Sequence, residues 1–376
     1  MSTEVEESLV VPDTSVPLVP ERRRRRRHSS RWRRWTRRPR HFFRRHKAGT
    51  ILAAIGVVLL ILLLLFIWWL LGLLGRVPRF DIDLDRDNRP AYVGTGTNLL
   101  LAGVDDRNGA DLHEMLAAPE WQKGVLRSDT IMVVHISEQG DHAQVVSIPR
   151  DSYVPVEGYG RTKINHAFSF GGPELLAAAV EDTIDMRIDH VLVADTEGFK
   201  GITEVIGGVP VYVSETVEDP QSNGVWTKGR HVLRGDSAMA YVRQRYNLPG
   251  GDFDRVRRQQ NLLRGIAVKA TQWNVLLNPF TVDDLVDEIA GHLAISDTLT
   301  DKKMRELVLT LRNLRVREIS FMTAPNVGSD RVGAMSVVRL QRTVVRDLFE
   351  AVARDDFRSY AIANEVDLLP PAREVR

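Results

Sequence analysis

The strongest constraint on this chain is an uncharged run from Ala48 to Gly75. Its core, residues 51–74, is built almost entirely from Leu, Ile, Val, Ala and Trp. A bilayer core of ~30 Å is crossed by about 20 helical residues, so this run is long enough to span a membrane. Trp68 and Trp69 lie near its far end, where amphipathic rings favour the membrane interface. The sequence therefore predicts one transmembrane helix over residues 48–75, with the remaining chain divided between its two sides.

Charge is segregated across this run. Residues 1–47 contain 15 Lys and Arg against 5 Asp and Glu, a local charge of +10, whereas the whole chain carries +2, which leaves −8 for residues 48–376. The flank after the run, residues 76–89, balances four Arg with four Asp. By the positive-inside rule, the N-terminus is expected in the cytoplasm. We therefore predict a single-pass protein of the cell membrane whose folded domain is extracytoplasmic.

Two other interpretations apply to the N-terminal region. A cleaved signal peptide has an apolar region of only ~7–15 residues, and this run is longer and starts later. The block Arg22–Arg27, with Trp32, Trp35 and Phe42 interleaved after it, is also compatible with a nucleic-acid-binding arm. Beside a membrane span, however, topology and attraction to anionic lipid account for the same charges. We therefore expect the membrane, and no nucleic acid, as the partner of this segment.

The rest of the chain divides by composition into four further parts. We expect a disordered Arg-rich tail at 1–47, a linker at 76–96, one folded domain at 97–356 and a C-terminal tail at 357–376. The absence of Cys excludes disulfides, a thiol nucleophile and Cys-ligated zinc. The sequence also lacks a Walker A loop, a Gly-x-Ser-x-Gly elbow and a His-Glu-x-x-His zinc motif.

Within the folded domain, apolar runs alternate with amphipathic segments. The segments expected to form strands are 98–104, 130–136, 143–148, 190–194, 209–213 and 317–322. The segments expected to form helices are 173–184, 196–206, 235–241, 253–271, 282–293, 301–314 and 336–354. Such alternation predicts an α/β fold, a three-layer α/β/α sandwich on a mixed central sheet, preceded by the transmembrane helix.

Polar clusters occur where the expected strands begin or end. Gly103–Arg107 directly follows one apolar strand, and Arg127–Thr130 directly precedes the next. Ile148–Asp151 ends a third strand, and Lys163–His166 comes shortly afterwards. Ligands of α/β proteins usually bind at the carboxyl ends of strands. Taken alone, either of the first two clusters is better explained as an ordinary solvated turn, and Arg150 is equally compatible with a surface pair to Asp151.

A further cluster is rich in Arg. Arg243-Gln244-Arg245 is followed by a stretch, residues 250–260, rich in Gly, Asp, Arg and Gln. If a helix begins near Asp252, then Asp252, Arg255 and Gln259 share one face. The planar fork of Arg suits bidentate contact with phosphate. Two or three carboxylates with five or more Arg fit a Mg²⁺-bridged diphosphate, at which transfer needs positioning and neutralisation of charge.

In this order the clusters resemble the LytR-CpsA-Psr proteins of Gram-positive and actinobacterial cell envelopes, from about Asn98 to about Ala270. The resemblance implies a Mg²⁺-dependent phosphotransferase that moves a glycan from a polyprenyl-pyrophosphate carrier to peptidoglycan through a phosphodiester bond. It also implies an apolar tunnel for the lipid. The motifs that carry it are Gly-Val-Asp at 103–105, Arg-Ser-Asp-Thr at 127–130, Ile-Pro-Arg-Asp at 148–151, Lys-Ile-Asn-His-Ala at 163–167 and Gly-Asp-Phe-x-Arg-x-x-Arg-Gln-Gln at 251–260.

The resemblance also implies roles for individual residues. Asp105 and Asp129 would hold Mg²⁺, with Asp106 an alternative to Asp105. Asp252 would activate the acceptor hydroxyl or orient an Arg, and Gln259 would hold the site from its helix. The basic residues expected to clamp the pyrophosphate are Arg127, Arg150, Arg243, Arg245 and Arg255, together with Lys163. Three alternatives stay open: a pyrophosphatase, a lipid-glycan binding protein on the same scaffold, and a membrane-anchored transcriptional regulator.

Overall fold

The computed structural model describes residues 72–106, 111–220, 224–244, 246–272, 275 and 278–375. The predicted tail 1–47 and residues 48–71 of the predicted transmembrane helix lie outside these ranges. None of the helices in the described ranges has the length and apolar character needed to cross a membrane.

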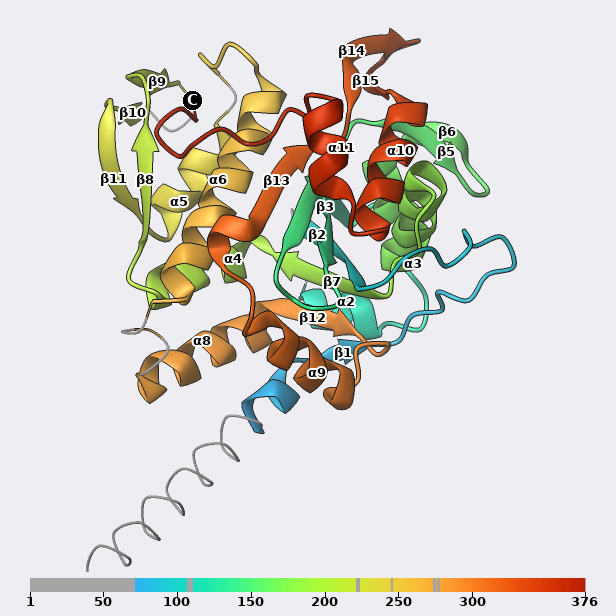
Figure 1. Ribbon diagram of the computed structural model, residues 1–376, viewed down its shortest axis with the longest axis horizontal. Coiled ribbons are helices and arrows are strands. Elements are labelled where there is room, and N and C mark those ends of the chain that lie inside the picture. The colour runs from blue at the N-terminus through green and yellow to red at the C-terminus, as the bar shows by residue number, and fades with distance from the viewer. Residues whose placement is uncertain are drawn as a thin grey trace, which may run out of the picture. The chain divides into compact units, whose positions relative to one another are not determined.

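The centre of the fold is a seven-stranded mixed sheet (Figure 1). Three neighbouring pairs are parallel and three are antiparallel, which confirms the predicted mixed central sheet. In spatial order the strands are β1 (Arg79–Phe80), β12 (Leu293–Ser296), β7 (His190–Asp195), β2 (Thr97–Asp106), β3 (Leu126–Ile136), β4 (Ala143–Ser147) and β13 (Ile319–Thr323).

Helices cover both faces of this sheet, because successive strand residues alternate between them. Leu100, Ala102 and Val104 of β2 face α2 (Leu112–Ala117), α3 (Ile164–Ile184) and α10 (Arg342–Ala353) in the largest apolar cluster. Leu99 and Leu101 point the other way. That face packs against α6 (Asp252–Ala270), α8 (Pro279–His292) and α9 (Asp301–Leu311).

A second, smaller core lies beside α6. The antiparallel pair β8 (Val209–Val213) and β11 (Gly229–Leu233) packs with α4 (Thr196–Val205) and α5 (Asp236–Arg243) around Tyr241 and Leu262. This core fixes α4, α5 and α6 next to one another at one end of the sheet. The remaining elements are η1 (Leu74–Arg76), β5 (Tyr153–Val156), β6 (Gly160–Lys163), β9 (Val217–Asp219), β10 (Gly224–Trp226), η2 (Val316–Glu318), β14 (Asn326–Val332), β15 (Met335–Leu340) and α11 (Phe357–Ala363).

Two expected helices differ from the structure. The helix expected over 336–354 is wrong in its first third, because Met335–Leu340 is strand β15, paired with β14. The β-branched Val337 and Val338 are buried there, and such side chains suit a pleated surface. The helix expected from Pro173 is preceded by another helical segment that starts at Ile164, with a kink where Gly172 has φ 68°. Pro173 then opens the second segment, as Pro commonly does at a helix start.

The segment predicted as a linker is attached to the domain by a buried carboxylate. Glu181 of α3 is 1% exposed. It accepts hydrogen bonds from Nη2 of Arg89 at 2.7 Å and from the backbone N–H of Ile188 at 2.8 Å, and Arg86 lies beside it. Glu181 thereby joins the 81–96 segment, α3 and the start of β7. The predicted C-terminal tail likewise contains α11 and a bridge from Leu368 to Met322.

Replacing Glu181 with Ala leaves the poorly exposed guanidinium of Arg89 without its carboxylate. Breaking a buried ion pair by removing one partner costs about 3 kcal/mol or more, so the free energy of unfolding should fall by roughly that amount. Urea denaturation followed by tryptophan fluorescence measures it. Glu350→Ala is the matched control, because the Glu350–Arg354 pair is exposed and contributes little. Equal stability of the Glu181 and Glu350 variants would contradict the structural role.

Because His190 is buried, we expect the folded domain to lose stability in mild acid. Its side chain is 4% exposed and its Nδ1 lies 2.8 Å from Oγ1 of Thr298. Burial, and secondly the charge of Lys303, lower its pKa from 6.5 to about 4. Between these values the unfolded chain binds more protons, so stability should fall as pH drops from 6.5 to 4, by roughly 3 kcal/mol in all. In denaturation series across this range, His190→Gln should flatten the slope, and the control His231→Gln, at a half-buried imidazole, should not. An unchanged slope in His190→Gln would refute the assignment.

Candidate functional site

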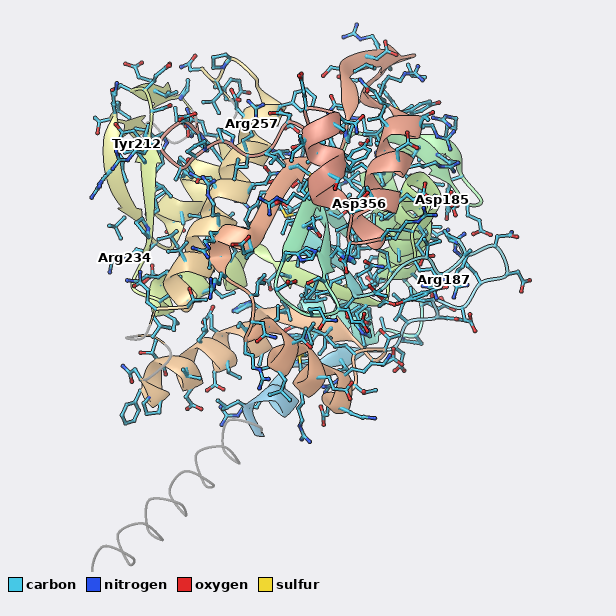
Figure 2. All side chains as sticks on the ribbon, in the orientation of Figure 1. Asp185, Arg187, Tyr212, Arg234, Arg257 and Asp356 are labelled. Carbon is cyan, nitrogen blue, oxygen red and sulfur yellow. The ribbon has the colours of Figure 1, made fainter. Side chains whose placement is uncertain are left out.

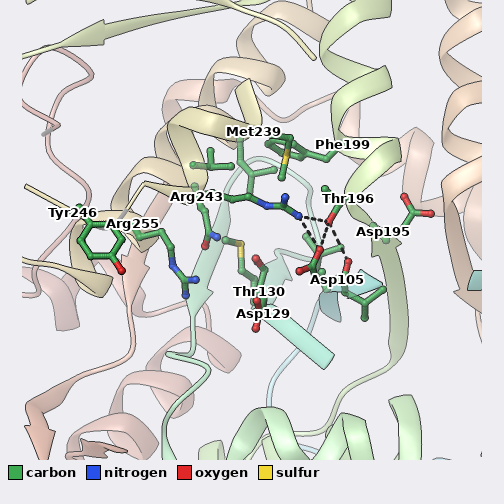
Figure 3. Close-up of a pocket in the computed structure, with 18 residues that line it drawn as sticks. Asp105, Asp129, Thr130, Asp195, Thr196, Phe199, Met239, Arg243, Tyr246 and Arg255 are labelled. Carbon is green, nitrogen blue, oxygen red and sulfur yellow. Dashed lines mark hydrogen bonds and ion pairs between the residues drawn. The ribbon is translucent and has the colours of Figure 1, made fainter. Parts of the chain in front are cut away.

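A cavity of about 400 Å³ lies where β2 and β7 end and α4, α5 and α6 pack against the sheet (Figure 3). One part of its wall is polar and another is apolar. The main polar lining residues are Asp105, Asp129, Thr196, Arg243, Arg255 and Gln259. The main apolar lining residues are Leu101, Met132, Phe199, Met239, Val242 and Leu263.

A β-bulge directs the second carboxylate into this cavity. In the β2–β3 ladder Gly103 pairs with Thr130 and Val104 pairs with Ser128, so Asp129 is the extra residue. Bulges locally re-aim side chains, and here two successive residues, Asp129 and Thr130, both line the cavity. Gly103 is required opposite Thr130, because a Cβ at residue 103 would lie 2.9 Å from the Cβ of Thr130. The Gly-Val-Asp and Arg-Ser-Asp-Thr motifs are therefore two sides of one irregular strand pair.

Asp105 is held by groups from two helices. Its Oδ1 accepts a hydrogen bond from Nη2 of Arg243 at 2.8 Å and from Oγ1 of Thr196 at 3.3 Å (Figure 3). Nη2 of Arg243 also donates to Oγ1 of Thr196 at 3.2 Å. Arg243 ends α5 and Thr196 begins α4, so the ends of two helices and one strand meet at this carboxylate. The carboxylate of Asp105 lines the cavity, whereas the side chain of Asp106 is outside the described residues.

Asp129 connects the cavity to a second Arg. Nη1 of Arg150 donates to Oδ1 of Asp129 at 2.7 Å, and Nη2 lies 3.9 Å from Oδ1 of Asp252. Nε of Arg150 is 3.8 Å from Oδ2 of Asp151, so the neighbour considered from sequence is a more distant partner than Asp129. Although burial acts in the opposite direction, these carboxylates raise the pKa of Arg150 above its ordinary value. Arg150 is thus a fixed cation beside the polar wall.

Helix α6 brings two of the three residues of the predicted face, Arg255 and Gln259, to the cavity lining. Asp252 is its first residue, Nη2 of Arg255 donates to Oδ2 of Asp252 at 3.1 Å, and Arg255 and Gln259 line the cavity. The backbone N–H of Gly250 donates to Asp254, so Asp254 stabilises the helix start. The next Arg points elsewhere: Nη2 of Arg257 donates to Asp367 near the C-terminus at 2.8 Å (Figure 2).

The structure does not bring every predicted residue to the cavity. Lys163 pairs with Asp151 at 2.8 Å, and the exposed Arg127 is opposite Asp105 in the β2–β3 ladder. Burial, followed by the charges of Lys163 and Arg127, lowers the pKa of His166, and Nδ1 of His166 lies 2.8 Å from Oγ1 of Thr162. Arg245 lies outside the described residues.

Other residues of the site were missed from sequence. Asp195 and Thr196 line the cavity, and Asp195 also accepts the N–H of Gly198 at the start of α4. Their position directly after an apolar strand was the available signal.

Arg258 was also missed. It is fully buried, its guanidinium lies 4.6 Å from the ring centroid of Tyr241, and its Nη1 donates to Oε1 of Gln244 at 2.5 Å. It anchors the end of α5 that carries Arg243, and no local pattern separates it from Arg257.

Comparisons with known proteins agree with this geometry. A Corynebacterium glutamicum protein, probable cell wall biosynthesis protein LcpB, is 36% identical over 226 residues, which cover 59% of this chain and 54% of the relative. A Bacillus cereus protein, polyisoprenyl-teichoic acid–peptidoglycan teichoic acid transferase TagU, is 36% identical over 200 residues, which cover 51% of this chain and 61% of the relative. The chain therefore spans little more than half the length of these curated relatives.

Solved structures share the fold. A LytR-Csp2A-Psr enzyme from Actinomyces oris superposes with a TM-score of 0.57 at 19% identity, over 74% of this chain and 96% of that chain. Bacillus subtilis TagV gives a TM-score of 0.55 at 21% identity, over 70% and 98%. The LytR_cpsA_psr family model matches residues 83–354, which include every motif described above. The chain therefore belongs to the LytR-CpsA-Psr family.

Proposed function

We propose that this protein is a phosphotransferase that links a glycopolymer, carried on polyprenyl pyrophosphate, to peptidoglycan. The observation that carries the proposal is the single cavity in which carboxylates and Arg form one wall and apolar side chains the other. A lipid-pyrophosphate donor is also amphiphilic: its pyrophosphate would contact the polar wall and its lipid chain the apolar wall. The relative in Bacillus cereus is named for a polyisoprenyl carrier and a peptidoglycan acceptor, which supports the same class of reaction.

The apolar wall suits the lipid part of the donor. Phe199, Met239 and Leu263 come from three different helices and face Leu101 and Met132 on the sheet. Burial of apolar surface stabilises a bound hydrocarbon by ~25 cal/mol per Å². Met side chains adapt easily to irregular chains. These residues are the lining we propose for the lipid tunnel implied by the family resemblance.

The polar wall suits transfer at a phosphorus atom. The acceptor hydroxyl oxygen would form a bond to the phosphorus next to the glycan, the bond to the lipid phosphate oxygen would break, and lipid phosphate would leave. Arg243, Arg150 and Arg255 would neutralise the charge that develops on the phosphate oxygens. Asp252 lies beside both Arg150 and Arg255, and we assign it the hydroxyl proton.

Asp105 and Asp129 fit a Mg²⁺ ion at the same wall. They come from adjacent strands and line one cavity, and Mg²⁺ commonly takes one or two protein carboxylates with phosphate oxygens and water. Within the described ranges, no group of three or more His, Asp or Glu side chains is arranged to hold a metal. When bound, the ion would neutralise charge on the pyrophosphate.

We further propose that residues 48–75 anchor the protein in the cell membrane, with the domain outside. The support is the length of the apolar run and the charge asymmetry around it. A donor with a polyprenyl chain resides in the same bilayer, so anchoring would keep the enzyme close to its substrate.

Arg255→Ala should lower the rate of glycan transfer about 100-fold or more, because it removes a cation held at the reacting phosphate. Arg257→Ala, two residues further along the same helix but directed at Asp367, should keep near-normal transfer. The assay uses the full chain in detergent with lipid-pyrophosphate glycan and peptidoglycan fragments, and it measures glycan phosphate bound to peptidoglycan. Equal activity of the two variants would refute the assignment. Release of free glycan phosphate would instead indicate a hydrolase, and tight binding without turnover a carrier or regulator.

Removal of divalent ions with EDTA should abolish transfer, and added Mg²⁺ should restore it. Asp129→Asn keeps the shape but loses the charge, so it should raise the Mg²⁺ concentration needed for half-maximal rate at least tenfold. Asp254→Asn, whose side chain binds Gly250 and not the cavity wall, serves as the carboxylate control. Full activity in EDTA would remove Mg²⁺ from the proposal while leaving the Arg cluster in place.

A further inference from the structure

Helix α9 has one face packed on the domain and one face open. Met304, Leu307 and Leu311 pack toward the sheet in two apolar clusters. The opposite side presents four exposed side chains at helical spacing, which are Lys302, Arg305, Leu309 and Arg312. Leu309 is 60% exposed in the middle of this stripe. We call these four residues the α9 stripe.

The charge of this region contrasts with that of the domain. From Asp301 to Arg315 there are five Lys and Arg against two Asp and Glu, a local charge of +3, whereas residues 48–376 together carry −8. Lys302 lies 3.9 Å from Glu306 on the same helix, whereas Arg305 and Arg312 have no ion-pair partner among the residues that the structure describes. Two guanidiniums and an exposed Leu are therefore available to a partner that combines negative charge with apolar surface.

Helix α9 packs, through its buried face, on the first residues of the chain that the structure describes. Leu73, directly before η1, is 1% exposed, and Val77 packs in one cluster with Met304 and Leu307 of α9. Nη1 of Arg76 binds Asp283 at 2.9 Å and Asp287 at 2.8 Å, which ties η1 to α8 as well. The first described residues of the chain are thus built into the α8–α9 layer.

We propose that the α9 stripe docks the domain onto a lipid surface with anionic headgroups. Basic side chains around an exposed apolar residue on one helix face are the features of interfacial helices. The proposal rests on the membrane anchor proposed above and is independent of the transfer chemistry. It predicts that the exposed face of α9 is in contact with the bilayer.

The absence of Cys from the chain allows a direct test. Leu309→Cys in the full chain is labelled with an environment-sensitive fluorophore and reconstituted in nanodiscs that contain phosphatidylglycerol. We expect blue-shifted emission that brominated lipids quench. Val327→Cys is the matched control: it is 69% exposed on β14, at the opposite end of the domain (Figure 1), and should keep the emission of a label in water. Water-like emission at residue 309 would overturn the proposal.

A second experiment tests whether the blue shift at residue 309 requires opposite charges on the protein and the lipid, or only closeness of the label to the bilayer. Lys302→Glu, Arg305→Glu and Arg312→Glu combined, or phosphatidylcholine as sole lipid, should each abolish the blue shift at residue 309; its persistence in both would refute anionic recognition. Circular dichroism checks that the triple variant is folded. Failure of the chain to enter nanodiscs would overturn the anchor together with this proposal. A normal blue shift without glycan transfer would overturn the transferase proposal alone.

Discussion

The site depends on one irregular pairing, the antiparallel contact between β2 and β3. A regular ladder would place Asp129 opposite Val104, on the face covered by α3, where an unpaired carboxylate would be costly. The bulge moves Asp129 to the cavity side, beside Thr130 and on the same wall as Asp105. All later contacts of the site build on this pair of carboxylates, because Arg243 and Arg150 each reach one of them.

Pairing of each carboxylate with a guanidinium has a consequence for binding. The cavity holds opposite charges close together, so these pairs keep its polar side chains in place before a ligand binds. An anionic ligand would compete with Asp105 and Asp129 for Arg243 and Arg150, while a cation near the carboxylates would relieve that competition. Arg and carboxylate together therefore suit a ligand that supplies both signs, which is the electrostatic reason for expecting a metal-bound pyrophosphate here.

The sequence allowed much of this arrangement to be predicted, because the relevant signals are local. Carboxylates at strand ends and the spacing of Asp252, Arg255 and Gln259 follow from strand and helix periods alone. The β15 strand was missed because Val337 and Val338 fit a helix pattern until a partner strand is present. Arg258 and Thr196 were missed for a similar reason. Only its contacts with Tyr241 and Gln244 distinguish Arg258 from its neighbour Arg257. Likewise, only its contacts with Asp105 and Arg243 distinguish Thr196 from any other residue at a helix start.

Helix α8 contacts both the start of the described chain and the helix that carries a residue of the cavity wall. Leu285 of α8 packs in the same cluster as Phe199, and Phe199 lines the apolar part of the cavity. The same helix binds Arg76 through Asp283 and Asp287, beside the buried Leu73. Close-packed side chains transmit displacement and do not absorb it. Helix α8 therefore connects the residues that precede β1 with the residues that pack behind the apolar wall of the cavity.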